Sequence, residues 1–320
     1  MRIFVYGWYN HSNLGDESYK LSFSNIWPEH QFTFSDTIKE DYADKYDLCI
    51  IGGGDVIREN SLKYISIFKC IKISISVTIT SLSLIPEINI LDHIYVRDIL
   101  SYNKLLNYGY KNVTLIPDIS IILKGDKNRG KNLINQIFKN NKSEKYSKVY
   151  TININSHLIG KASTSSKDTN MFYKMLYETV DLIDRTSASF LFLSFGTSLP
   201  WDDRVTNGLV NSYTKFYKKN CVIYDVLSIQ DSLDIISASD LIITSRFHGL
   251  IFGLGNNIPT IPISFHDKMR GFCDTINKKY INYWNFSSFE VEKYISDVES
   301  EKIDTNKIKN DYREKIYFLQ

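Results

Sequence analysis

The stretch LIITSRFHGLIFGLGNNIPTIPISFHDKMRGF (residues 241–272) decides the fold class of this chain. It begins with a β-branched run, LIIT (241–244), and continues through helix-forming residues at 248–255. It then returns to a second β-branched run, TIPI (260–263). A strand, a helix and a strand at this spacing predict a βαβ unit with parallel strands.

Short β-branched runs and longer helical patterns alternate in the same way along nearly the whole chain. We expect strands at 2–6, 48–51, 75–80, 94–97 and 113–116, and a second series at 149–154, 190–194, 222–225, 241–244 and 260–263. Helices are expected near 16–27, 99–108, 168–186, 203–218, 230–238, 248–255 and 267–277. Two such series, each too short for a large barrel, predict an α/β protein made of two Rossmann-like domains.

The polar stretch at 124–148 separates the two series and is expected to be a linker. A chain of 320 residues has room for two domains, because domains commonly hold ~100–200 residues. We therefore expect an N-terminal domain over 1–135 and a C-terminal domain over 136–303. The last segment, 304–320, has the pattern of a charged amphipathic helix that could pack back on the first domain.

Charge and composition exclude several classes of protein. The 38 basic and 36 acidic residues are scattered, so no basic block indicates nucleic-acid binding. The N-terminal apolar run is too short for a signal peptide, and the apolar region 65–88 is interrupted by lysines and falls short of the ~20 residues that span a bilayer. The four cysteines lie far apart, which indicates neither a zinc site nor a disulfide framework. We expect a cytoplasmic protein without a transmembrane segment, and peripheral membrane association remains open.

Polar residues that a packed core does not need follow the strand at 241–244. Arg246 and His248 lie two positions apart across the turn into a helix, where unpaired backbone N–H groups favour an anion. With Gly249 and Lys268 nearby, they predict an anion site with a titratable proton donor. A lone histidine more often packs in a core, and residues 266–268 could simply open the next helix.

The segment GWYNHSNLGDES (7–18) follows the first expected strand. A glycine-containing turn that leads into a helix suits an anion, although the segment lacks the G-x-G-x-x-G pattern of dinucleotide sites. Asn13, Gly15 and Asp16 together indicate function. For Asp16 alone, a helix N-cap is an equal alternative.

Three more motifs follow strands of the first series. GGGD (52–55) permits close approach of a ligand to the backbone, or makes a tight turn. Arg97, in YVRD (95–98), suits a carboxylate or phosphate, or pairs with its neighbour Asp98. Asp118 could contact a ligand or cap the next turn.

In sequence order, these motifs resemble those of the polysaccharide pyruvyl transferase family. NLGDES is similar to the family's Asn-x-Gly-Asp-Glu element, and GGGD to its glycine-rich turn. VRD-x-x-S with the later PD resembles its central block, and the stretch 245–272 resembles its Ser-x-Arg-x-His-Gly signature. One departure is that 75–90 carries no glycine, where the family usually has glycines after a strand.

The resemblance implies a glycosyltransferase-B-like fold with the active site in the cleft between the domains. It also implies phosphoenolpyruvate as donor, a sugar or glycan as acceptor, a lipid-linked carrier being one option, and a pyruvate ketal as product. No metal or other cofactor is expected. The acceptor side and Arg97 would belong to the N-terminal domain, and the donor side to the C-terminal domain.

The resemblance and the chemistry together assign roles to individual residues. The expected catalytic residues are His248 as general acid, Arg97 and Asp16. The expected donor-binding residues are Ser245, Arg246, Gly249, Lys268, Gly53 and Gly54, and the expected acceptor-binding residues are Asn13 and Asp118. Two alternatives remain: a nucleotide-sugar glycosyltransferase of the same fold, and a catalytically silent glycan-binding relative.

Overall fold

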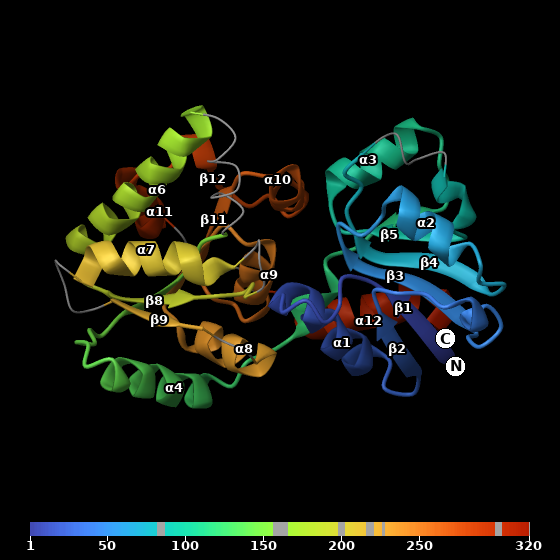
Figure 1. Cartoon of the computed structure of the whole chain (residues 1–320), viewed down its shortest axis with the longest axis horizontal. Helices are drawn as coiled ribbons and strands as arrows, with labels where there is room; N and C mark the ends of the chain where they lie inside the picture. Colours follow the sequence, from blue (N-terminus) through green and yellow to red (C-terminus); the bar gives the residue numbers. More distant parts are fainter. Residues whose placement is uncertain are drawn as a thin grey trace.

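A computed structural model describes residues 1–81, 87–155, 166–197, 202–215, 221–225, 228–297 and 303–319. Within these residues the chain forms two α/β units that lie side by side (Figure 1). Each unit is built on its own six-stranded sheet, and all neighbouring strands are parallel. The prediction of two Rossmann-like halves is therefore confirmed.

The first sheet has the strand order β2-β1-β3-β4-β5-β6. Its central strand β3 is buried along its whole length, as is typical of a parallel sheet covered on both faces. The strand order reverses between β1 and β3, so their carboxyl ends flank a topological switch point. The strands are β1 (Arg2–Tyr6), β2 (Gln31–Ser35), β3 (Leu48–Gly54), β4 (Ile71–Val77), β5 (His93–Val96) and β6 (Val113–Leu115), and the helices are α1 (Leu14–Ile26), α2 (Glu59–Ile65) and α3 (Ile99–Asn107).

The second sheet has the order β12-β11-β10-β7-β8-β9, which is the Rossmann order when it is followed from β9. Here the order reverses between β7 and β10, which creates a second switch point. The strands are β7 (Val149–Asn153), β8 (Ser189–Leu193), β9 (Cys221–Tyr224), β10 (Leu241–Thr244), β11 (Thr260–Ser264) and β12 (Ile281–Asn282). The helices that follow β7 are α6 (Ser166–Arg185), α7 (Asp203–Lys215), α8 (Ile229–Ala238), α9 (Phe247–Gly255), α10 (Asp267–Thr275) and α11 (Ser288–Asp297).

The expected linker at 124–148 is wrong over most of its length, because residues Lys127–Asn140 form helix α4. Its apolar residues Ile134, Ile137 and Phe138 are buried at helical spacing among lysines and asparagines. Arg129 pairs with Asp231 and Asp234 of α8, so α4 packs on the second unit. The expected domain boundary at 135/136 thus falls inside a helix.

Other differences are smaller. Strands β2 and β12 and helices α2 and α11 were not expected. β2 was missed because QFTFS alternates polar and aromatic residues at a partly exposed sheet edge and has no β-branched run. β4 begins and ends earlier than the expected strand at 75–80. Part of the glycine-free region (82–86), the end of the expected helix at 203–218 and the last residue lie outside the described residues.

The C-terminal segment returns to the first unit. Helix α12 (Thr305–Lys315) and the 3-10 turn η5 (Tyr317–Leu319) lie against it, and the two chain ends are close together (Figure 1). Tyr312 is 1% exposed, and its hydroxyl donates a hydrogen bond to the Pro117 carbonyl. Its ring packs edge to face against that of Trp27. This contact makes the C-terminal helix part of the first unit's core.

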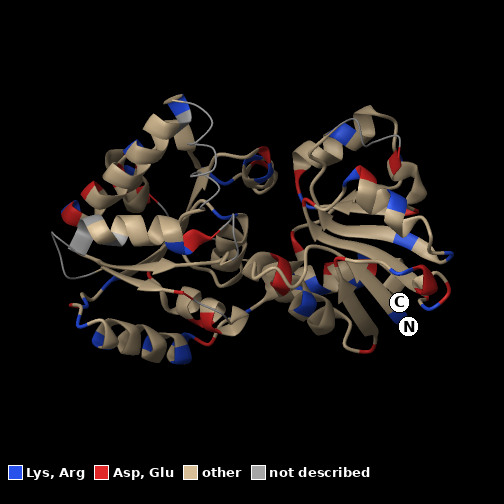
Figure 2. Ribbon diagram, viewed as in Figure 1, with Lys and Arg blue, Asp and Glu red and all other residues tan. Residues whose placement is uncertain are grey.

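Hydrogen bonds join the two units at two places. Leu14 N, at the start of α1, donates to the Phe195 carbonyl at 2.8 Å. Ile99 N, at the start of α3, donates to Thr275 Oγ1 of α10, also at 2.8 Å. In the parts of the chain that the structure describes, charged residues of both signs are spread over both units (Figure 2).

Candidate active site

A cavity of about 980 Å³ lies between the two units. Its walls come largely from the segments that follow β1, β3, β4 and β5 in the first unit and β7, β8, β10 and β11 in the second. Both switch points therefore open into it, and α/β sheets bind ligands at such points. Of the residues predicted for the site, the cavity is lined by Asn13, Asp16, Gly54, Arg97, Ser245, Arg246, His248 and Lys268.

Arg97 lies at the carboxyl end of β5 and is only 1% exposed. Its Nε donates to Thr78 Oγ1 at 2.9 Å, and its Nη1 donates to Tyr19 and to Asp118 at the same distance. The guanidinium also lies 4.1 Å from the ring centre of Phe247, which belongs to the second unit. Burial disfavours the charge, but Tyr19, Asp118 and Asp55 raise the pKa of Arg97 above its usual value, so the side chain stays charged.

Asp118 is fully buried beneath Arg97 and does not line the cavity. Its carboxylate accepts from Arg97 and Tyr19, and it caps the turn η3 (Ile119–Ile122) by accepting from Ser120 N. Although burial works in the opposite direction, the charge of Arg97 and the hydrogen bonds from Ser120 and Arg97 lower the pKa of Asp118. Asp118 thus holds the Arg97 guanidinium from a position outside the cavity lining, where the acceptor-binding role predicted for it would need it to face the cavity.

His248 occupies the first turn of α9 and is connected to Arg97 through Tyr19. Its Nε2 lies 3.2 Å from the Tyr19 hydroxyl. That hydroxyl gives its proton to Asp118, so its oxygen accepts, and Nε2 carries the hydrogen of the neutral imidazole. Burial, with the positive charges of Arg97, Lys268 and Arg246, lowers the pKa of His248 to about 3. Burial is the main cause of this lowered pKa.

Gly15 is explained by this imidazole. A Cβ built at Gly15 would lie 2.0 Å from His248 Nδ1. Only a residue without a side chain lets the start of α1 approach the ring so closely. The glycine of the NLGDES motif therefore serves the contact between the two units.

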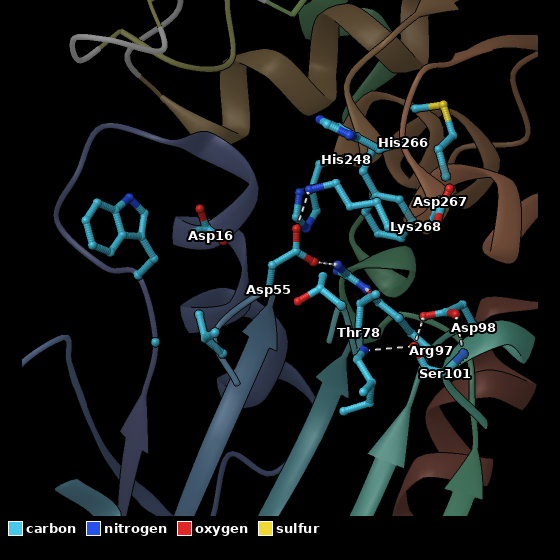
Figure 3. Close-up of a pocket in the computed structure, with 18 of the residues that line it drawn as sticks. Asp16, Asp55, Thr78, Arg97, Asp98, Ser101, His248, His266, Asp267 and Lys268 are labelled. Carbon is cyan, nitrogen blue, oxygen red and sulfur yellow. Dashed lines mark hydrogen bonds and ion pairs between the residues drawn. The ribbon is translucent and has the colours of Figure 1, made fainter. Parts of the chain in front are cut away.

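Asp55 joins the two units across the cavity (Figure 3). Its Oδ2 accepts from Lys268 Nζ at 2.9 Å, and its Oδ1 lies 3.6 Å from Arg97 Nη2. Burial opposes ionisation, but Lys268 and Arg97 outweigh it and lower the pKa of Asp55 to about 2. Among the described residues Oδ1 has no hydrogen-bond partner, so its contact with Arg97 is an ion pair without a hydrogen bond.

Asp16 faces the same space from the first turn of α1. The N-cap of that helix is Asn13, whose side chain accepts from Gly15 N at 3.1 Å. Asp16 is thus not the cap, which decides the alternative that the sequence left open. Burial, with a smaller contribution from Asp55, raises the pKa of Asp16 to about 7, although Lys268 and Arg97 partly offset the rise.

Arg246 lines the cavity from the N-cap position of α9. Its Nε lies 3.1 Å from both carboxylate oxygens of Asp203, and its Nη2 donates to Oδ1 at 2.5 Å. Asp203 also accepts from the backbone N–H groups of Phe195 and Gly196. The guanidinium is therefore held in one orientation, with its charge partly neutralised.

Two predicted donor-binding glycines lie elsewhere. Gly53, with a φ of +77°, packs against the ring of Tyr19, and Gly249 packs against the side chain of Thr244. Neither is among the residues that line the cavity, so their donor-binding role stays a prediction. Ser245 does line it, and its Oγ accepts from Asn155 N at 2.7 Å.

Tyr19, Asp55 and Asp203 were not assigned roles from the sequence. Tyr19 lies three positions after Asp16, so helical spacing could have placed both on one side of α1. Asp55 stands in the quoted GGGD motif. Asp203 had no signal beyond its place at the start of a helix.

In the described parts of the chain, no group of three or more His, Cys, Asp or Glu side chains is placed to hold a metal ion. Among the helices described there, none combines the length and apolar character needed to cross a bilayer.

The sequence model of the polysaccharide pyruvyl transferase family matches residues 5–267. The chain belongs to this family. The match spans the motifs at 7–18, 52–55 and 95–118 and most of the stretch at 245–272, which confirms the resemblance. No curated protein sequence is significantly similar to this pyruvyl transferase family member.

Solved structures show the fold of this family member. MnaA of S. aureus, solved with UDP, superposes with a TM-score of 0.67 at 11% identity over 99% of this chain and 96% of that one. The UDP-GlcNAc 2-epimerase of Methanocaldococcus jannaschii gives 0.63 at 9% identity over 99% and 100%. At such identities the likeness concerns the fold alone, and it confirms a glycosyltransferase-B-like architecture.

Proposed function

We propose that the cavity transfers the enolpyruvyl group of phosphoenolpyruvate to a sugar and forms a pyruvate ketal. The observation that carries the proposal is the ion pair shared across the cavity, in which Arg97 of one unit and Lys268 of the other both face the Asp55 carboxylate. Two cations that approach one carboxylate from opposite units are also placed to bind the carboxylate or phosphate of a ligand. Phosphoenolpyruvate carries one of each, and its binding would displace Asp55.

The reaction balances with two neighbouring hydroxyls of the acceptor. A proton adds to the methylene carbon of the donor, which becomes the methyl group, and the first hydroxyl attacks the neighbouring carbon and loses its proton. The second hydroxyl then replaces phosphate at the same carbon, and its proton leaves with the inorganic phosphate. Fixed cations near the leaving phosphate stabilise the charge that develops on it.

His248 and Asp16 share the proton transfers in this proposal. His248 is neutral in the free protein, but a dianion bound beside it raises its pKa, so donor binding would make it the general acid. Asp16, whose pKa of about 7 makes it easily ionised near neutral pH, would take the proton of the attacking hydroxyl.

Thermal unfolding with and without ligand tests the donor. Phosphoenolpyruvate at 100 times its Kd should add about 2.7 kcal/mol of stability, and UDP- or GDP-sugars at the same concentration should add much less. The reverse order would support a nucleotide-sugar glycosyltransferase. Mass spectrometry of sugars incubated with the protein and phosphoenolpyruvate should then find a product heavier by one pyruvyl ketal.

The His248→Gln variant tests the acid role. It should keep most of the thermal stabilisation by phosphoenolpyruvate and lose ~10²–10⁴ in rate, because a positioned general acid contributes that much. A near-normal rate would make His248 a structural residue. Loss of donor binding together with the rate would make it a phosphate ligand.

A further inference from the structure

An aromatic edge of the cavity plays no part in the proposed chemistry. The side chains of Trp8 and Tyr64 belong to the first unit and line the cavity, yet they are 46% and 51% exposed. Tyr6, at the end of β1, lines the same cavity. Large exposed aromatic side chains beside a polar pocket often mark a binding surface.

Trp8 is held in place rather than loosely exposed. Its indole stacks on the imidazole of His11, with ring centres 3.7 Å apart and planes 13° from parallel. His11 Nε2 lies 2.7 Å from Asp36 Oδ2, which fixes the imidazole in turn. One face of the indole is thus supported by a neighbouring ring, while Trp8 as a whole is 46% exposed and lines the cavity.

The loop that carries Trp8 is also pinned to helix α1. Asn10 and Ser12 have φ values of 66° and 53°, which is an unusual conformation for residues with side chains. The Asn10 backbone N–H donates to Glu17, and Lys20 donates to the Asn10 side chain at 2.9 Å. A loop held in this way presents the indole without a large ordering cost on binding.

Polar groups complete the edge. Arg58 and Asn60, at the start of α2, are exposed and line the same cavity. A pyranose ring has an apolar face of C–H groups, which the negative face of an aromatic ring attracts, and a rim of hydroxyls that need hydrogen-bond partners. An indole, a guanidinium and an amide that line one cavity can supply both kinds of contact.

We propose that Trp8 is the stacking platform for a pyranose ring of the acceptor glycan, and that Arg58 and Asn60 bind its hydroxyls. That this glycan is the acceptor of pyruvyl transfer rests on the proposed function. The platform lies on the first unit, so the acceptor would enter from the side opposite Lys268 and His248. A nucleobase would also stack on an indole, and the experiment separates the two.

The test is binding to an array of immobilised oligosaccharides with terminal hexoses and N-acetylhexosamines, without phosphoenolpyruvate. We compare the wild type, Trp8→Ala, Trp8→Phe and Tyr177→Ala, the last a control because Tyr177 is 73% exposed on α6 and does not line the cavity. Wild type and Tyr177→Ala should retain the same glycans. Trp8→Ala should lose about tenfold or more in affinity, and Trp8→Phe should lose less, because it keeps a ring.

Trp8→Ala without ligand should unfold cooperatively at a temperature close to that of the wild type, which shows that the variant is folded, and its stabilisation by phosphoenolpyruvate should equal that of the wild type. If glycan binding depends on Trp8 but phosphoenolpyruvate does not bind, the platform stands and the proposed function fails. The platform is refuted if the wild type retains no glycan, or if Trp8→Ala retains glycans as well as the wild type. It is also refuted if the substitution weakens UDP binding but not glycan binding.

Discussion

Replacing Arg97 by methionine should destabilise the protein strongly, whatever it does to activity. Arg97 is 1% exposed and Asp118 is fully buried, with Nη1 and Oδ2 at 2.9 Å. Without the guanidinium, the donors left to Asp118 among the described residues are the hydroxyls of Tyr19 and Ser120 and the backbone N–H of Ser120. Removing one partner of such a buried pair typically costs ~3–5 kcal/mol, because a charge remains in a poorly solvated place.

The double variant Arg97→Met/Asp118→Asn removes both charges and serves as the matched comparison. Its loss of stability should be clearly smaller than the sum of the two single losses, because no uncompensated charge remains. Urea unfolding at pH 7, followed by circular dichroism, measures the free energy of unfolding of the wild type, Arg97→Met, Asp118→Asn and the double variant. An Arg97→Met protein within ~1 kcal/mol of the wild type, or a double variant as unstable as the sum, would refute the reasoning.

The pH dependence gives an independent check with a definite sign. The pKa of Asp118 is lowered in the folded wild type, so its ionised form stabilises the fold above the unfolded pKa of ~3.9. That stability is lost as pH falls through the folded pKa. The difference in the free energy of unfolding between the wild type and Arg97→Met should therefore become smaller at acid pH. If the double variant is folded, it should still bind phosphoenolpyruvate poorly, which separates the role of Arg97 in binding from its role in stability.

Three further results are expected. If Asp16 takes the acceptor proton, turnover should rise as the pH increases through about 7, and Asp16→Asn should abolish this rise. A fall in wild-type turnover over the same pH range would make Asp16 an acid instead. Lys268→Met should raise the KM for phosphoenolpyruvate by about tenfold or more, since a charge-assisted hydrogen bond contributes ~1.5–3 kcal/mol, and an unchanged KM would remove Lys268 from the donor site. Gly15→Ala should slow turnover because its Cβ would collide with the His248 ring, and wild-type kinetics would show that the ring can move without consequence.

The sequence was informative where the signal is local. The β-branched runs predicted strands β10 and β11 closely, and the turn between 244 and 248 was correctly placed at a strand end before a helix. The same reasoning failed for α4, where many lysines and asparagines obscured an apolar stripe three or four residues apart. It also failed for β2, because the residues of this edge strand are partly or fully exposed and do not need a continuous apolar run.

By itself, the sequence determined the α/β class, the two series of strands, the family, and the polar residues at strand ends, because strand and helix periodicity and turn chemistry are carried by neighbouring residues. Only the tertiary structure decided how those residues divide their roles. It placed Asp118 behind Arg97, brought Lys268 to Asp55 across 213 positions, and moved the pKa values of Asp16 and His248 in opposite directions. Burial and ion pairing depend on which distant segments meet, and that is settled only when the two sheets and their loops close on one cavity.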